Sequence, residues 1–214
     1  MIYKKLIIVI FNSILLCQSF DIARVQYDGG GDWYSDPSSI PNLLNYLKEN
    51  TQIKNIGKEQ RVRLTDNNII NYPYLYLTGH GNIRFSEEEV ESLRDILLSG
   101  SFLHADDNYG MDKSFRREIK KVFPNKKFVD LPHDHPIFSS YFNIKNGLPK
   151  IHEHDNNPPR ALAIFHNKKI ILLYTFESDL GDGWEYESVH NDPKHIRESA
   201  LKMGVNIIYH VLSN

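Results

Sequence analysis

The sequence has 214 residues, of which 24% are charged, and its formal net charge is −2. A chain of this length buries a full hydrophobic core as one domain, and no second domain is required. The acidic balance argues against nucleic acid as a partner. Cys17 is the single cysteine, so a chain that loses its N-terminus has no disulfide, no thiolate metal ligand and no cysteine nucleophile.

The N-terminal 19 residues have the order of a secretory signal peptide. A basic start is followed by an apolar run at residues 6–16 and by small residues before an expected cleavage after Ser19. The apolar run is shorter than the roughly 20 residues of a spanning helix, so a permanent N-terminal anchor is the weaker alternative. Lipidation of Cys17 is a third and still weaker one.

Removal of residues 1–19 leaves 23 basic residues against 27 acidic ones, a net charge of −4. We therefore expect residues 20–214 to form a single exported domain in the periplasm or cell envelope. No membrane span is expected after cleavage.

The first predicted strand, residues 22–27, ends in a polar loop with three successive glycines. Consecutive glycines indicate positive φ or the close approach of another group. A helix with a leucine face follows, which places the loop at a helix N-terminus, where anions are favoured. A tight turn with no ligand explains the same glycines, and the spacing is not the GxGxxG of dinucleotide sites. The loop residues expected at a ligand site are Asp28, Gly29, Gly30, Gly31 and Trp33.

Residues 72–110 predict a strand, a helix and a second strand. Ser86 followed by Glu89 predicts a capping box at the start of the helix, and apolar residues recur at helical spacing up to Gly100. Strands joined by a crossover helix run parallel, so the polar loops after both strands lie at the same, carboxyl edge of one sheet. Open α/β sheets bind their ligands at that edge.

Candidate catalytic side chains follow both strands of this unit. An acid pair with a histidine partner performs general acid and base catalysis, and glycine N–H groups can form an oxyanion hole. Alternatively, the acids cap the next helix and the histidine within the second strand is a core residue. The candidates are His80, His104, Asp106 and Asp107, with Gly79 and Gly81 as backbone contacts to a ligand.

The remaining sequence predicts a helix at residues 112–123, a strand at 127–131, a long polar loop at 143–160, an antiparallel hairpin at 161–165 and 170–176, a loop at 177–185 and a helix from residue 193. Arg116 lies near the start of the first of these helices, where it can lean over the preceding acidic loop. A solvated basic face is the alternative.

The long polar loop contains His152, His154 and Asp155. In an extended segment the two histidines project to the same side with the aspartate beside them, a pattern that predicts a divalent metal ion. Side chains at the carboxyl edge would complete the coordination. Exposed loop histidines without a metal have the same spacing, and no other cofactor is expected.

The loop at residues 177–185 combines acids, glycines and a tryptophan. Asp179, Asp182 and Glu185 suggest calcium, but their spacing departs from an EF-hand and Asp-Gly turns explain it. Trp184, like Trp33, adjoins acids as in sugar-binding surfaces, although packing of the loop is the alternative. The residues of this loop expected at a ligand site are Glu177, Asp179 and Trp184.

Seven motifs in order resemble one family: YDGGGDWY, YLTGHGNIRFSEEEVESLR, FLHADDNYGMDKSFRREIKKVFP, DHPIF, LPKIHEHD, ESDLGDGWE and VHNDP. Over about residues 22–212 the chain is similar to the bacterial domain-of-unknown-function family 4159. That family resembles the class I glutamine amidotransferase-like superfamily and the trehalose-utilisation proteins. The resemblance implies a flavodoxin-like α/β fold, with a mostly parallel sheet and flanking helices.

Amidotransferases of this superfamily use a cysteine after the strand that corresponds to residues 101–105, where this chain has Asp106 and Asp107. We therefore expect no glutamine amidotransferase activity. Two classes of function remain. The first is a cell-envelope domain that binds a small polar, carbohydrate-like ligand or a protein partner, and the second is a hydrolase, with or without a metal, that uses the same cleft.

Overall fold

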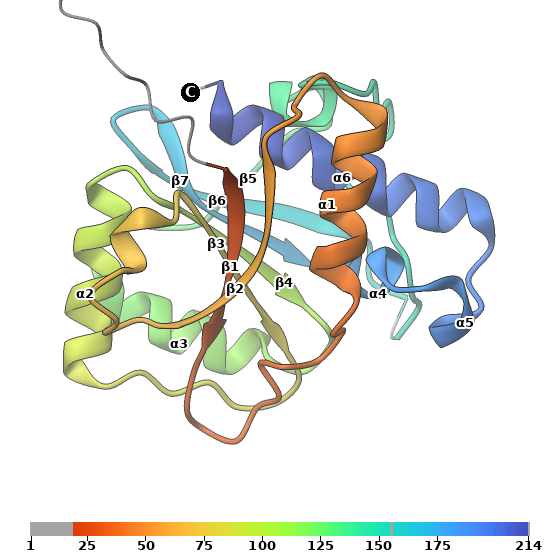
Figure 1. Ribbon diagram of the computed structural model, residues 1–214. Helices are drawn as coiled ribbons and strands as arrows, with labels where there is room; N and C mark the ends of the chain where they lie inside the picture. The colour runs from red at the N-terminus through yellow and green to blue at the C-terminus, as the bar shows by residue number, and fades with distance from the viewer. Residues whose placement is uncertain (1–18, 155, 214) are drawn as a thin grey trace, which may run out of the picture.

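The computed structural model describes residues 19–154 and 156–213, which form a seven-stranded sheet between two layers of helices (Figure 1). The strands are β1 (Phe20–Gln26), β2 (Ile56–Arg63), β3 (Tyr74–Gly79), β4 (Phe102–Asp107), β5 (Val129–Asp130), β6 (Arg160–His166) and β7 (Lys169–Phe176). The helices are α1 (Ser39–Asn50), α2 (Glu87–Leu98), α3 (Asp112–Val122), α4 (Leu180–Trp184), α5 (Glu187–His190) and α6 (Lys194–Leu212), with short 3₁₀ turns η1 (Ile69–Asn71) and η2 (Pro136–Ser139).

The sheet is mostly parallel, as the sequence predicts. Its order is β2-β1-β3-β4-β7-β6-β5, and β6 alone runs antiparallel to its neighbours within this sheet. β3 and β4 pair in register, with Thr78 opposite Asp106 and Gly79 opposite Asp107. The predicted strand–helix–strand unit and the antiparallel hairpin of β6 and β7 are both confirmed. The loops after β1, β3, β4 and β7 therefore emerge at one carboxyl edge.

Both faces of the sheet are covered, with α2 and α3 on one side and α1 and α6 on the other (Figure 1). β3 shows why: Leu75 and Leu77 face the α2/α3 layer, whereas Tyr74 and Tyr76 face the α1/α6 layer. A strand buried on both faces has no polar side, so its sequence is mostly apolar. This packing fixes the strand ends that carry the site.

Helix boundaries follow local signals. Ser86 caps α2 by accepting from the Glu89 N–H, and the Glu89 carboxylate accepts from the Ser86 N–H at 2.8 Å, which confirms the predicted capping box. At Gly204 of α6, a Cβ would lie 2.5 Å from Leu43 Cδ1 of α1. The glycine thus lets α6 pack closely against α1.

Three details differ from the sequence predictions. Asp106 and Asp107 belong to β4 instead of the following loop, because their backbones pair with Thr78 and Gly79 of β3. Residues 177–185 contain the one-turn helix α4, which begins after Asp179 in the left-handed conformation, at φ 57°. The short α5 was not predicted.

Two predictions lie outside the described residues. They are the signal peptide predicted for residues 1–19, of which the structure describes only Ser19, and Asp155 as a metal ligand. Across residues 19–154 and 156–213, no helix has the length and hydrophobicity to cross a membrane.

Candidate functional site

The carboxyl edge of the sheet carries two groups of titratable side chains. We call Asp106, Asp107 and Asp179 the buried acids, since each is at most 2% exposed. We call Asp36, His152, Asp182, Glu185 and His190 the histidine–acid cluster. The first group holds the loops in place, and the second faces partly outward.

Asp106 is the structural anchor of this edge. Its carboxylate accepts hydrogen bonds from the Gly181 N–H at 2.6 Å, the Tyr76 hydroxyl at 3.2 Å and the Thr175 hydroxyl. Burial raises the pKa of Asp106 to about 7, although these hydrogen bonds act to lower it. Because Gly181 lies in α4, Asp106 connects β4 to the helix that carries Asp182.

His104 and Asp107 are also committed to partners within the protein. His104 Nε2 lies 2.9 Å from the Thr175 hydroxyl and its Nδ1 lies 3.0 Å from the Tyr74 hydroxyl. Burial lowers the pKa of His104 to about 3, so the ring is neutral. Asp107 accepts from the Met111 N–H at 3.4 Å, and burial raises its pKa to about 6. Neither side chain reaches solvent.

Only one of the two carboxylate oxygens of Asp179 has a hydrogen-bond partner among the described residues. Its Oδ2 lies 2.8 Å from His154 Nε2, whereas Oδ1 is buried and has no hydrogen-bond partner among the described residues. Burial, and then the charges of Asp106 and Asp182, raise its pKa to about 8. An unpaired buried carboxylate oxygen is costly, which makes this a position of chemical interest.

His152 is held between two carboxylates. Its Nδ1 lies 2.7 Å from Asp182 Oδ2 and its Nε2 lies 3.1 Å from both oxygens of Asp192. The hydrogen bond to Asp182 is the main reason that the pKa of His152 rises to about 9. His190 Nε2 lies 3.8 Å from Asp182 Oδ1 and 3.3 Å from Glu185 Oε2. The two imidazoles therefore meet at Asp182.

Asp36 completes the cluster from the loop after β1. The Asn108 amide donates to Asp36 and, at 3.4 Å, to Asp182. Burial and the neighbouring Asp182 raise the pKa of Asp36 to about 8. The pKa of Asp182 is lowered: burial acts to raise it, but the His152 hydrogen bond and the His190 charge outweigh burial.

The glycine-rich loop after β1 packs against the loop after β3. The Gly31 N–H donates to Asn82 O at 3.0 Å, and a Cβ at Gly31 would lie 2.7 Å from His80 O. His80 pairs with Asp32 at 3.1 Å and its side chain is 53% exposed. Close approach of two loops thus explains these glycines, and His80 points to Asp32 instead of Asp106.

Other predicted residues of the first loops lie outside the cluster. Asp28 is exposed and lies 3.4 Å from Arg63, and Trp33 is partly buried with its ring edge-on to Tyr34. Gly29 and Gly30 have positive φ values of 119° and 94°. Gly79 and Gly81, in the loop after β3, also have positive φ values, of 133° and 84°.

Four predicted residues have structural contacts. Arg116 pairs with Asp112 at 2.6 Å and lies over three aromatic rings. Glu177 is buried and pairs with Lys150 at 2.9 Å. Trp184, expected at a ligand surface, is instead a core residue whose indole N–H donates to Ala200 O at 2.8 Å. His154 stacks on Tyr109, with ring centroids 4.5 Å apart.

Sequence reasoning did not single out Asp36, His190 and Asp192. Asp36 lies just before the helix that follows the glycine-rich loop, and the other two lie in the VHNDP motif before α6. A usable signal was the polar run His190-Asn191-Asp192 beside a proline, since polar loop residues often belong to functional sites. Their convergence with His152 depends on contacts between distant loops.

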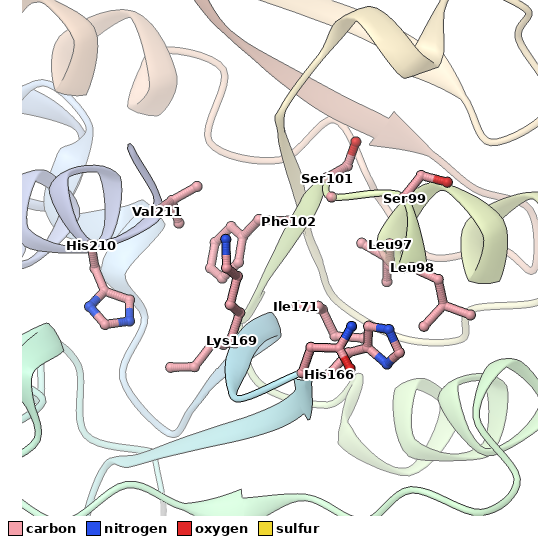
Figure 2. Close-up of a pocket in the computed structure, with 13 residues that line it drawn as sticks. Leu97, Leu98, Ser99, Ser101, Phe102, His166, Lys169, Ile171, His210 and Val211 are labelled. Atoms are coloured by element: carbon pink, nitrogen blue, oxygen red, sulfur yellow. The ribbon is translucent and has the colours of Figure 1, made fainter. Parts of the chain in front are cut away.

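A pocket of about 260 Å³ lies at the opposite, amino edge (Figure 2). The ends of α2 and α6 and the hairpin of β6 and β7 line it with mostly apolar side chains, together with His166, Lys169 and His210. Its volume is just below the ~300 to 1,000 Å³ of typical small-molecule sites. It includes none of the candidate residues.

The family model "Domain of unknown function (DUF4159)" matches residues 21–212, which is nearly the whole described chain. The chain belongs to this family. No curated protein matches this DUF4159 chain. Its function must therefore be argued from its site.

Proposed function

We propose that this DUF4159 protein binds a small polar, carbohydrate-like ligand at the histidine–acid cluster. The observation that carries the proposal is a set of exposed tyrosines on loops at the same edge of the sheet as the cluster. Tyr34, Tyr109 and Tyr186 are 61%, 47% and 60% exposed, and they follow β1, β4 and β7 at the carboxyl edge. Aromatic faces beside carboxylates suit sugars, because the rings pack on C–H groups while the acids accept from hydroxyls.

The fold supports the same location. We infer a flavodoxin-like, class I amidotransferase-like architecture, since the order β2-β1-β3-β4 with a further parallel strand is that of doubly wound sheets. Such sheets bind ligands beyond the carboxyl ends of their strands. β4 ends in Asp106 and Asp107 where an amidotransferase needs cysteine, so amidotransferase activity is not part of the proposal.

A hydrolase is the second candidate. It is favoured by one observation, the partly exposed imidazoles of His152 and His190 on either side of Asp182. This is the arrangement of a general acid–base pair. Release of p-nitrophenol from p-nitrophenyl acetate, phosphate or glycosides, lost in Asp182→Asn, would support hydrolysis. Equal rates of p-nitrophenol release by the unmodified protein and by Asp182→Asn would exclude hydrolysis of these substrates at this site.

We also propose export, on the signal-like order of residues 1–19. Mass spectrometry of the protein from an envelope fraction should find Phe20 at the N-terminus. An intact N-terminus in a cytoplasmic fraction would contradict export.

Ligand-observed NMR with glucose, N-acetylglucosamine and their β-1,4 disaccharides tests the binding proposal. At least one sugar should bind at millimolar concentration. Tyr109→Ala and Tyr186→Ala should each weaken binding roughly two- to tenfold, because a lost aromatic contact costs about 0.5 to 1.5 kcal/mol. Tyr141→Ala is the matched control, a 39% exposed tyrosine that donates to Asn50 O at the end of α1. No binding, or equal losses in all three variants, would refute the proposal.

A further inference from the structure

Five side chains of the histidine–acid cluster converge on one small volume. One ligand atom from each of His152, Asp182 and His190 lies within 4.8 Å of the other two, and the same holds for Asp36, Glu185 and His190. The two groups share His190. These side chains come from three separate segments, the loop after β1, the loop before β6 and the segment from α4 to α5.

His152 is oriented by contacts at both of its ring nitrogens. His152 directs Nδ1 toward Asp182 while its Nε2 lies against Asp192. A carboxylate behind an imidazole is the usual outer support of a metal-binding histidine. The arrangement therefore fixes the ring with one nitrogen facing the cluster.

The carboxylates have matching support. The Ser38 N–H and hydroxyl donate to Glu185 Oε1 at 3.2 and 3.1 Å, which leaves Oε2 facing His190. The Asn108 amide donates to Asp36 and Asp182. Outer hydrogen bonds of this kind orient ligating carboxylates.

The cluster contains more carboxyl groups than basic side chains. Asp36, Asp182 and Glu185 bring three carboxyl groups into a little-exposed volume, and among the described residues no lysine or arginine side chain pairs with them. Asp179, with its unpartnered buried Oδ1, adds a fourth acid near Asp182. Histidine–carboxylate pairs alone would leave that oxygen unsatisfied.

We propose that the histidine–acid cluster is a divalent metal centre, with His152, Asp182 and His190 as the primary ligands and Asp36 and Glu185 beside them. Two imidazoles and a carboxylate, with no sulfur, suit Zn²⁺ or a neighbouring transition ion, whereas Ca²⁺ and Mg²⁺ prefer oxygen alone. Three protein ligands leave a coordination position for an outside group.

The metal proposal deepens the ligand-binding proposal, on which it rests, by naming the group that would hold a ligand's hydroxyls. Metal binding itself is measured with Zn²⁺ alone. The two proposals can therefore fail separately. Zn²⁺ binding without sugar binding would refute only the sugar-binding proposal. Sugar binding that persists in the presence of EDTA would refute only the metal proposal.

The test uses purified protein without a histidine tag, stripped with EDTA and dialysed. Calorimetry with ZnCl₂ should show one equivalent bound, elemental analysis should agree, and Co²⁺ should give the visible absorption bands of a low-coordinate site. Absence of stoichiometric Zn²⁺ binding would overturn the proposal.

Substitutions locate the ion. His152→Ala and His190→Ala should each weaken Zn²⁺ binding by at least about a hundredfold, and Asp192→Asn, behind the ligand, by roughly ten- to a hundredfold. His80→Ala is the matched control, a histidine at the same edge that pairs with Asp32, and it should bind as the unmodified protein does. Circular dichroism checks folding. Equal affinities in His190→Ala, Asp192→Asn and His80→Ala would place the ion elsewhere and overturn the assignment.

Discussion

The two edges of the sheet differ in what their connections carry. At the carboxyl edge, the loops after β1, β4 and β7 and the loop before β6 bring together carboxylates, imidazoles and an amide that contact one another. At the amino edge, helix ends and the turn of the hairpin surround a hollow with mostly apolar walls (Figure 2). The amino edge has a distinct pocket, and the carboxyl edge has the cluster of interacting carboxylates and imidazoles.

This difference shows that a pocket and a cluster of reactive side chains can lie at opposite edges of the sheet within one domain. Parallel strands end together at the carboxyl edge, so their loops can place polar groups against each other at a fixed spacing. The pocket at the amino edge has no comparable set of convergent groups among the described residues. Substitutions at the two edges should therefore affect stability and ligand binding differently if the carboxyl edge is the functional one.

The largest expected effect comes from Asp106→Ala. The substitution leaves the Gly181 N–H and the Tyr76 hydroxyl without their acceptor in the core. Each unsatisfied buried group costs about 1 to 3 kcal/mol, so we expect a loss of roughly 2 to 5 kcal/mol in the free energy of unfolding. Urea unfolding monitored by circular dichroism measures it.

His80→Ala is the control for that experiment. The side chain is half-exposed at the same edge, and its removal should change stability by no more than about 0.5 kcal/mol. Similar losses in both variants would contradict the division between buried anchor and exposed loop.

Gly183→Ala should have the next largest effect. A Cβ at Gly183 would lie 2.5 Å from Ala200 Cβ and 3.2 Å from Ile151, so α4 must move away from α6. Overpacking of this kind costs about 1 to 3 kcal/mol. Since Asp182 lies on α4, Zn²⁺ affinity should fall as well, and calorimetry would detect this. A stable variant with unchanged affinity would show that the position of α4 does not matter for the site.

Stability should fall as pH rises from about 6.5 to about 8. The folded-state pKa of Asp106 is raised to about 7 and that of Asp179 to about 8, far above the unfolded value of about 3.9. In this range the folded state binds more protons than the unfolded state, so the free energy of unfolding decreases with pH. His152, with its pKa raised to about 9, acts in the same direction. Denaturant unfolding at several pH values measures the slope.

Asp106→Asn separates the contributions to that slope. The amide does not titrate, so the variant should lose less stability across the same range. His104 opposes the slope at the lower end of this range, because the unfolded imidazole is still partly protonated near its pKa of about 6.5, whereas burial lowers the folded-state pKa of His104 to about 3. A slope as steep as that of the unmodified protein would mean that Asp106 is already ionised at pH 6.5.

The sequence predicts the fold well because its signals are local. The Ser86 capping box, the apolar run of β3 and the period of α2 act within a few residues, and a crossover helix forces its two strands to be parallel. The sequence does not predict that β7 pairs with β4, because this pairing joins residues about 70 positions apart.

The site is less predictable for the same reason. The histidine pair at residues 152 and 154 was visible in the sequence, but the structure turns His152 toward Asp182 and His154 toward Asp179. Asn108 reaches Asp36 across 72 residues. Such convergence depends on how four loops end at one edge, and no local pattern encodes it.

The smallest effect should come from Ser99→Trp at the amino edge. Ser99 is exposed at the end of α2 and borders the pocket in Figure 2, so the substitution should change the free energy of unfolding by no more than about 0.5 kcal/mol. The added indole would obstruct the pocket while leaving the carboxyl edge untouched. Zn²⁺ and sugar binding should therefore equal those of the unmodified protein, measured by the same calorimetry and NMR. If Ser99→Trp abolished sugar binding at unchanged stability, the pocket at the amino edge would be the ligand site, and the histidine–acid cluster would retain only its role toward the metal.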